Sequence, residues 1–142
     1  MMSKSTPLVV VDDDQDDREI FEQIATDLNI PYERRWFFDT ATAMEYLSGT
    51  KEQVFLIFCD INLPGNSGLE FKKKIDGDPL LRKKSIPFVF FSTAANQKDI
   101  NAAYMEMTIQ GFFKKGTNYQ DIKTMIGLII DYWSLCRHPN AV

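Results

Sequence analysis

Two groups of aspartates follow apolar runs in this sequence, and carboxylates in that position could hold a cation. Asp12 and Asp13 come directly after the run at residues 8–11, and Asp60 follows the run at residues 54–59. Ionised carboxylates lose their water at the end of a buried strand, which is costly unless a partner compensates. If the two strands lie side by side in a parallel sheet, their carboxyl ends meet at one edge. An oxygen-rich cluster there suits a hard ion such as Mg²⁺, which accepts a phosphoryl oxygen as a further ligand. The residues therefore predict a site that receives a phosphoryl group on an aspartate.

The aspartates need a framework, and apolar runs typical of strands alternate with segments whose apolar residues recur at helical spacing. Strands are predicted at residues 8–11, 35–38, 54–59, 88–91 and 112–113, and helices at residues 20–28, 41–47, 69–75, 100–107 and 122–133. Thr40 is predicted to cap the second helix, and the lysines at 72–74 are interpreted as a solvated helix face. Five β-α units predict one α/β domain with a doubly wound parallel sheet.

Length and composition limit the function further. The 142 residues favour a single domain, with a core at about 7–134 and a flexible C-terminal tail at 137–142. The net charge is −4, so the chain lacks the basic excess of a nucleic-acid-binding protein. No signal peptide and no membrane-spanning run are visible, so a cytoplasmic protein is expected. Cys59 and Cys136 are expected to be free thiols, and the single His138 leaves no plausible zinc or Ser-His-Asp site.

Five features, each at the end of a predicted strand, together resemble the receiver domain of two-component response regulators. They are the pair Asp12 and Asp13, then Asp60, then Pro64 with Gly68, then a hydroxyl at Ser92 or Thr93, and finally a lysine at Lys114 or Lys115. The resemblance spans roughly residues 7–134. It implies a flavodoxin-like sheet of five parallel strands in the order 2-1-3-4-5, with two of five helices on one face and three on the other. The ending 131–133 is also similar to stand-alone receivers paired with bacterial phytochrome kinases.

The resemblance also implies roles for individual residues. Asp60 would be the phosphoacceptor, and Asp12 and Asp13 would hold Mg²⁺ together with the backbone carbonyl of Asn62. A lysine and a hydroxyl would bind the remaining phosphoryl oxygens, because phosphoryl transfer depends mainly on alignment and charge neutralisation. The domain would not be an enzyme beyond self-catalysed phosphotransfer and autodephosphorylation.

Two of these assignments have an alternative one position away. Counting forward along the fourth strand selects Ser92 as the hydroxyl, and counting back from the lysine selects Thr93. Ser92 is preferred, because the forward count stays within one strand. The pattern around the fifth strand selects Lys115, with Lys114 as the alternative. Gly116 follows where most receivers have a proline, which leaves the geometry of the Lys115–Gly116 bond open.

The resemblance implies protein partners. The phosphoryl donor would be a phosphohistidine on a sensor histidine kinase, or a phosphotransfer protein. A downstream protein would bind the face made by the fourth helix, the fifth strand and the fifth helix, where Phe112 would be the switch aromatic. A homodimer through the apolar C-terminal helix is a further possibility, and neither nucleic acid nor membrane is expected as a partner.

Two other interpretations use the same residues. Haloacid-dehalogenase-like phosphatases also begin with a strand followed by Asp-x-Asp, here Asp12 and Asp14, but they carry Thr or Val where this chain has Asp16. A pseudo-receiver that binds without being phosphorylated is disfavoured, because no residue type of the pocket is missing. Asp14, Asp16 and Asp17 are interpreted as the solvated, acidic start of a helix.

Overall fold

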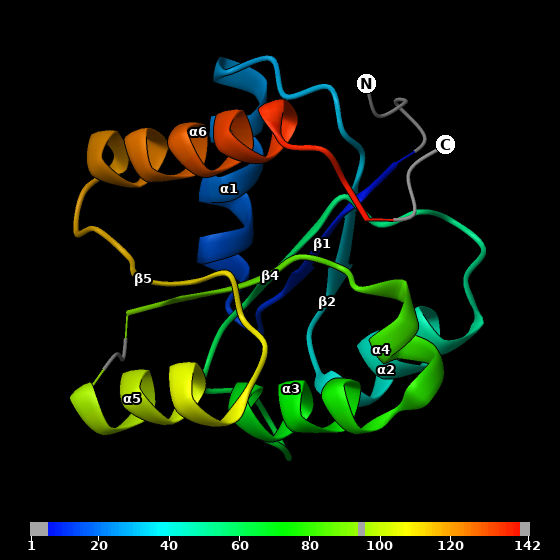
Figure 1. The fold of residues 1–142 in the computed structure, drawn as a ribbon. Helices are drawn as coiled ribbons and strands as arrows, with labels where there is room; N and C mark the ends of the chain where they lie inside the picture. Colours follow the sequence, from blue (N-terminus) through cyan, green and yellow to red (C-terminus); the bar gives the residue numbers. More distant parts are fainter. Residues whose placement is uncertain (1–5, 94–95, 140–142) are drawn as a thin grey trace.

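The computed structural model describes residues 6–93 and 96–139, which form a parallel sheet with helices on both faces (Figure 1). The five strands lie in the order β2-β1-β3-β4-β5, as predicted, and all neighbouring pairs are parallel. Their bounds are β1 Leu8–Val11, β2 Arg34–Phe37, β3 Leu56–Cys59, β4 Phe88–Ser92 and β5 Gly111–Lys114. The predicted α/β fold class is therefore confirmed.

Within the described residues six helices surround the sheet, one more than predicted. One face carries α1 (Gln15–Asp27) and α6 (Tyr119–Leu135), and the other carries α2 (Thr40–Gly49), α3 (Gly68–Gly77), α4 (Pro79–Lys84) and α5 (Gln97–Glu106) (Figure 1). The additional helix is α4, because Asp78 accepts the backbone N–H groups of Leu80 and Leu81 and Pro79 occupies the first turn. None of the described helices is both long and apolar enough to cross a membrane.

The central strands are apolar throughout because both of their faces are buried. In β1, Leu8 and Val10 belong to the core cluster under α1 and α6, whereas Val9 and Val11 belong to the cluster under α2 to α5. All four of these side chains are at most 4% exposed. Alternate residues of one strand thus pack on opposite layers, and the strand cannot move without disturbing both.

Side-chain caps set where the helices begin beside the sheet edge. Asp14 caps α1, Ser67 caps α3 and Asn96 caps α5, each by accepting backbone N–H groups of the first turn. The prediction of Thr40 as a cap is wrong: Asp39 accepts the N–H of Thr42, and Thr40 is the buried first residue of α2.

Lys72 departs from its predicted place on a solvated helix face. It is only 3% exposed, and its Nζ donates to Asp76 Oδ1 at 2.8 Å and to Thr108 Oγ1 at 3.2 Å. Thr108 lies in the connection between α5 and β5 and also donates its backbone N–H to Asp76. Lys72 and Asp76 therefore join α3 to the segment that leads into the edge strand β5.

The beginning of the predicted C-terminal tail packs on the domain. His138 is only 9% exposed, and its ring stacks on Phe55 at 4.8 Å between centroids and meets Trp133 edge-on. Burial lowers the pKa of His138, which favours its neutral form. His138 thus packs on the domain within the segment 137–142 that is predicted as a flexible tail, and residues 140–142 lie outside the described part.

Candidate functional site

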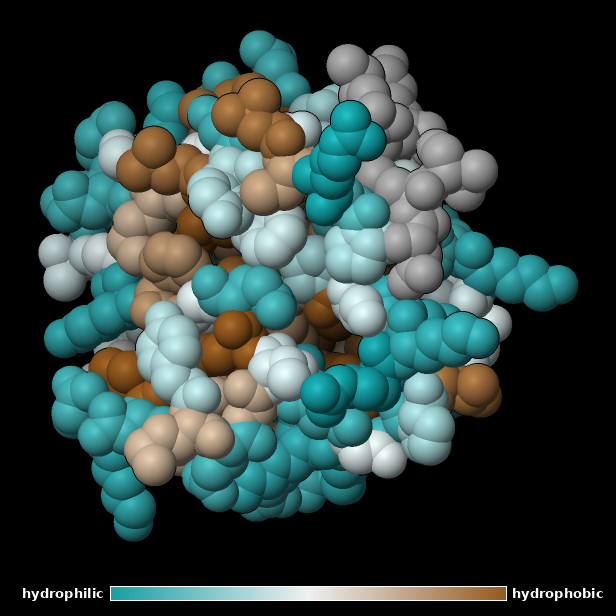
Figure 2. All heavy atoms as spheres, in the orientation of Figure 1, coloured by the Kyte–Doolittle hydropathy of each residue, from teal (hydrophilic) through white to brown (hydrophobic). Residues whose placement is uncertain are grey.

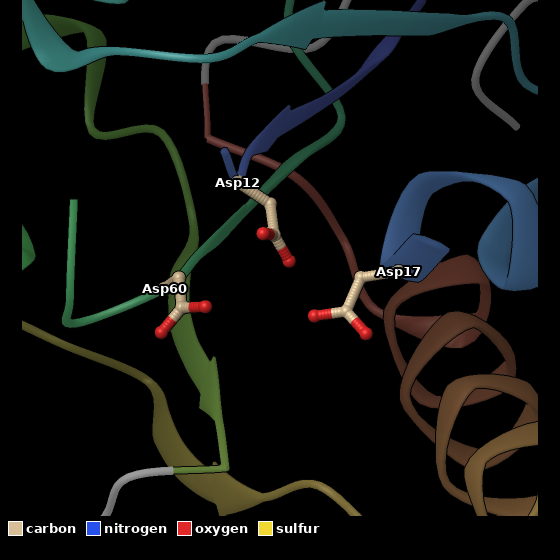
Figure 3. A group of neighbouring side chains, drawn as sticks. All are labelled: Asp12, Asp17 and Asp60. Atoms are coloured by element: carbon tan, nitrogen blue, oxygen red, sulfur yellow. The ribbon is translucent and has the colours of Figure 1, made fainter. Parts of the chain in front are cut away.

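Four predicted site residues meet at the carboxyl edge of the sheet because each ends, or follows directly, a parallel strand. Asp12 follows β1, Asp60 follows β3, Ser92 is the last residue of β4 and Lys115 follows β5. Asp17 joins them from the first turn of α1. The carboxylates of Asp12, Asp17 and Asp60 point toward one another (Figure 3), and one oxygen from each lies within 4.8 Å of the others.

The two carboxylate oxygens of Asp60 have different surroundings. Oδ1 accepts the hydroxyl of Ser92 at 2.6 Å, the backbone N–H of Ile61 at 2.7 Å and that of Asn62 at 3.4 Å. Oδ2 faces the ammonium group of Lys115 at 3.7 Å. The side chain of Asp60 is therefore held through one oxygen, and the other is directed toward a cation.

Lys115 is the cation at the centre of the site. Its Nζ donates to Oδ2 of Asp12 at 2.8 Å and to Oδ2 of Asp17 at 2.9 Å, and the residue is only 8% exposed. Burial alone would lower the pKa of Lys115, but the charges of Asp12 and Asp60 and its two hydrogen bonds outweigh burial and raise the pKa. Lys115 is thus held in its charged form.

The site carries more negative than positive charge. Burial raises the pKa of Asp12 by more than Lys115 lowers it, which shows how costly its ionised form is here. Three carboxylates share the ammonium group of Lys115. Carboxylate oxygens are the ligands that Mg²⁺ prefers, so the donor set and its charge both fit a hard divalent cation.

The remaining predicted site residues lie around this centre. Asp13 is exposed and outside the carboxylate group, and Asn62 is exposed with its backbone N–H directed at Asp60. Thr93 and Lys114 are both exposed, so the structure brings Ser92 and Lys115 to Asp60 instead of their neighbours. The Lys115–Gly116 peptide bond is trans.

Asp17 is the residue that sequence analysis missed. The sequence predicts a solvated helix start at this residue, yet Asp17 contacts Lys115, which lies 98 residues later in the chain. No local pattern distinguishes Asp17 from Asp16, which is exposed. Its one signal in the sequence is its place in the first turn of the helix that follows Asp12.

Gly68 allows α3 to begin directly against Asp60. A Cβ at this position would overlap the backbone carbonyl oxygen of Asp60, and the Gly68 N–H donates to the carbonyl of Ile61 at 2.8 Å. Only glycine lets the two backbones approach so closely. The glycine predicted as part of the motif therefore shapes the loop that carries Asp60.

Comparison with known proteins identifies this arrangement. Residues 8–127 match the response regulator receiver domain. The chain belongs to this family. The match confirms the predicted family. Receiver domains are signalling modules that act with histidine kinases or phosphotransfer proteins and bind Mg²⁺ in an acidic pocket. No curated protein matches the chain in a sequence search.

Solved structures of receivers share the whole fold. The phosphorylated cyanobacterial phytochrome response regulator RcpA is 25% identical, with a TM-score of 0.83, over 96% of this chain and 99% of its own. The Mn²⁺-bound form of the response regulator Rcp1 is also 25% identical, with a TM-score of 0.81 and the same coverage. RPA3017, from red light signalling in R. palustris, has a TM-score of 0.84 at 18% identity, over 96% of this chain and 99% of its own, and supports the fold alone.

Proposed function

We propose that this receiver accepts a phosphoryl group from a phosphohistidine onto Asp60, with Mg²⁺ as cofactor. The donor is a sensor histidine kinase or a phosphotransfer protein. One observation carries the proposal: Asp60 is held through Oδ1 by Ser92 and Ile61, while Oδ2 faces Lys115. A carboxylate fixed in this way presents one oxygen to an incoming phosphorus atom.

Three side chains of the site, those of Asp60, Lys115 and Ser92, take part in the proposed phosphoryl transfer. Oδ2 of Asp60 attacks the phosphorus, the P–N bond to the donor imidazole breaks, and its electron pair stays on the imidazole nitrogen. The product is an acyl phosphate on Asp60. Lys115 binds one phosphoryl oxygen by charge, and the Ser92 hydroxyl can turn from Oδ1 to donate to another.

Asp12 and Asp60 would hold the Mg²⁺ ion, with Asp13 and the carbonyl of Asn62 as the further ligands that the family resemblance implies. The bound ion supplies neutralisation of phosphoryl charge. The Asp13 carboxylate is exposed and lies outside the group formed by Asp12, Asp17 and Asp60, so its side chain would have to turn toward them to bind the ion.

Acetyl phosphate with Mg²⁺, followed by intact-mass measurement, tests the proposal. The wild-type chain should gain one phosphoryl group, and removal of Mg²⁺ with a chelator should prevent the gain. Asp60→Asn should gain none, whereas Asp16→Asn, a matched change on an exposed residue of the same edge, should label like wild type. Labelling that persists in Asp60→Asn would refute the assignment of the phosphoacceptor.

The output surface proposed here is the face of α5, β5 and α6. Phe112 of β5 is half-buried and packs on Phe90 at 5.5 Å between centroids, so its side chain contacts the core and also reaches the surface. Tyr104 of α5 is 55% exposed beside it. Phosphorylation would shift the packing of Phe112, and a downstream protein would read the changed surface.

The outer side of α6 supports a further contact in this proposal. Leu128, Tyr132 and Leu135 are 66%, 63% and 88% exposed, and Figure 2 shows hydrophobic side chains gathered over this helix at the top of the view. Exposed apolar residues grouped on one helix are typical of a protein interface. A second copy of the chain is the expected homodimer partner here, and sedimentation at increasing concentration tests it.

The phosphatase alternative finds no support in the same region. Its second aspartate would be Asp14, but this side chain caps α1 by accepting the N–H groups of Asp16 and Asp17. A binding-only receiver is equally unsupported, because Asp60, Ser92 and Lys115 are all assembled.

Cys59 and Cys136 are free, which fits the reducing cytoplasm expected for this domain.

A further inference from the structure

Lys115 has two carboxylate partners besides the proposed phosphoacceptor, and only one of them belongs to the proposed Mg²⁺ site. Asp12 lies at 2.8 Å and belongs to the proposed Mg²⁺ site. Asp17 lies at 2.9 Å from the same Nζ and belongs to α1. A metal-bound Asp12 has less charge to offer the lysine, which leaves Asp17 as its other hydrogen-bond acceptor.

Asp17 is itself fixed in place by the start of the helix. Its backbone N–H donates to the side chain of Asp14, the cap of α1, at 3.3 Å. Its side chain is 30% exposed, whereas that of Lys115 is 6% exposed. The carboxylate therefore reaches from the rim of the site inward to a buried ammonium group whose long side chain has several rotatable bonds.

We infer that Asp17 is a positioning residue, which keeps Nζ of Lys115 directed at Oδ2 of Asp60 when Asp12 is engaged by the cation. The inference rests on the proposed function. Lys115 lies 3.7 Å from Oδ2, beyond a hydrogen bond, so its place is set by its other partners. The oxygens of a phosphoryl group on Oδ2 would lie farther from Asp60 than Oδ2 itself. The ammonium group of Lys115, held by Asp17, could then bind one of them.

Three variants of the full chain test this role by the rate of labelling with acetyl phosphate at saturating Mg²⁺. Asp17→Ala removes the acceptor and should lower the maximal rate by about tenfold, the size expected for one hydrogen bond to a charged group. Asp17→Asn keeps an acceptor oxygen in place and should recover most of the rate. Asp16→Ala removes a neighbouring carboxylate that does not touch Lys115 and should match wild type.

The second readout is the NMR signal of the Lys115 ammonium group, assigned by its loss in Lys115→Met. In the Mg²⁺-loaded chain this signal should be sharp in wild type and in Asp17→Asn, and it should broaden or disappear in Asp17→Ala. An Asp17→Ala chain that keeps both the wild-type rate and the sharp signal overturns the inference. If wild type takes up no phosphoryl group, the proposed function fails, but the signal still decides whether Asp17 holds Lys115.

Discussion

The hydroxyl of Ser92 donates a 2.6 Å hydrogen bond to Oδ1 of Asp60, from a residue 32 positions later in the chain. The bond joins the ends of β3 and β4, which are neighbours in the sheet. It orients the carboxylate so that Oδ2 remains directed at Lys115. In the proposed reaction, the hydroxyl that orients the Asp60 carboxylate would therefore also donate to a phosphoryl oxygen after transfer.

Replacement of Ser92 should therefore slow phosphorylation of Asp60. Ser92→Ala removes the donor to Oδ1, and we expect the rate of labelling by acetyl phosphate to fall about tenfold, as for a hydrogen bond to a charged group. Thr93→Ala is the matched control, because Thr93 is exposed, and it should label like wild type. A loss confined to Thr93→Ala would exchange the two assignments.

Loss of the buried lysine should destabilise the metal-free fold. Lys115→Met leaves Asp12, which is only 5% exposed, without its cationic partner. We expect the free energy of unfolding to fall by about 3 kcal/mol in a urea titration, the lower end for a broken buried ion pair. Saturating Mg²⁺ should restore part of this loss. Lys114→Met changes an exposed side chain and should have little effect.

The ion pair of Lys72 gives a similar test away from the site. Lys72→Met leaves Asp76, whose side chain is only 13% exposed, without its cation, and the free energy of unfolding should fall by about 3 kcal/mol. Lys73→Met removes a 53% exposed lysine that pairs with Glu106 at 3.4 Å, and surface pairs of this kind contribute about 0–1 kcal/mol. Equal stability of the two variants would contradict the structural role of Lys72.

Asp76 should also make the fold sensitive to acid. Burial alone would raise its pKa, but hydrogen bonds from Lys72 and Thr108 outweigh burial and lower it. A carboxyl whose pKa is lower in the folded than in the unfolded chain stabilises the fold above its unfolded pKa. This contribution is lost as the pH falls through the folded value. Urea titrations across this acidic range should show a shallower pH dependence for Asp76→Asn than for wild type. A parallel pair of curves would count against this explanation.

Strand positions could be predicted because burial on both faces leaves a strong local signal. The apolar run 54–59 predicts a strand over its whole length. The observed strand begins only at Leu56, although Val54 and Phe55 are also buried. Apolar runs report burial, and hydrogen-bond pairing decides where a strand starts. Asp78 followed by Pro79 is a typical helix start, but Asp78 is also the C-cap of α3, so the sequence does not separate α4 from the end of α3.

The site could be predicted only where the topology alone brings residues together. Asp12, Asp60, Ser92 and Lys115 each stand at a strand end, so a parallel sheet places them at one edge. Contacts of helix residues follow no such rule. Asp17 contacts Lys115, 98 positions away in the sequence, and Lys72 contacts Thr108, 36 positions away. No local sequence pattern indicates either contact.

The bond between Tyr104 and β5 bears on aggregation. β5 is an edge strand, and the backbone N–H of Phe112 donates to the hydroxyl of Tyr104 at 3.1 Å. Unpaired N–H groups on an edge strand are templates for intermolecular strand addition. The tyrosine occupies one such donor with its own side chain, so sheet extension between copies is opposed at the border of the surface proposed for partners.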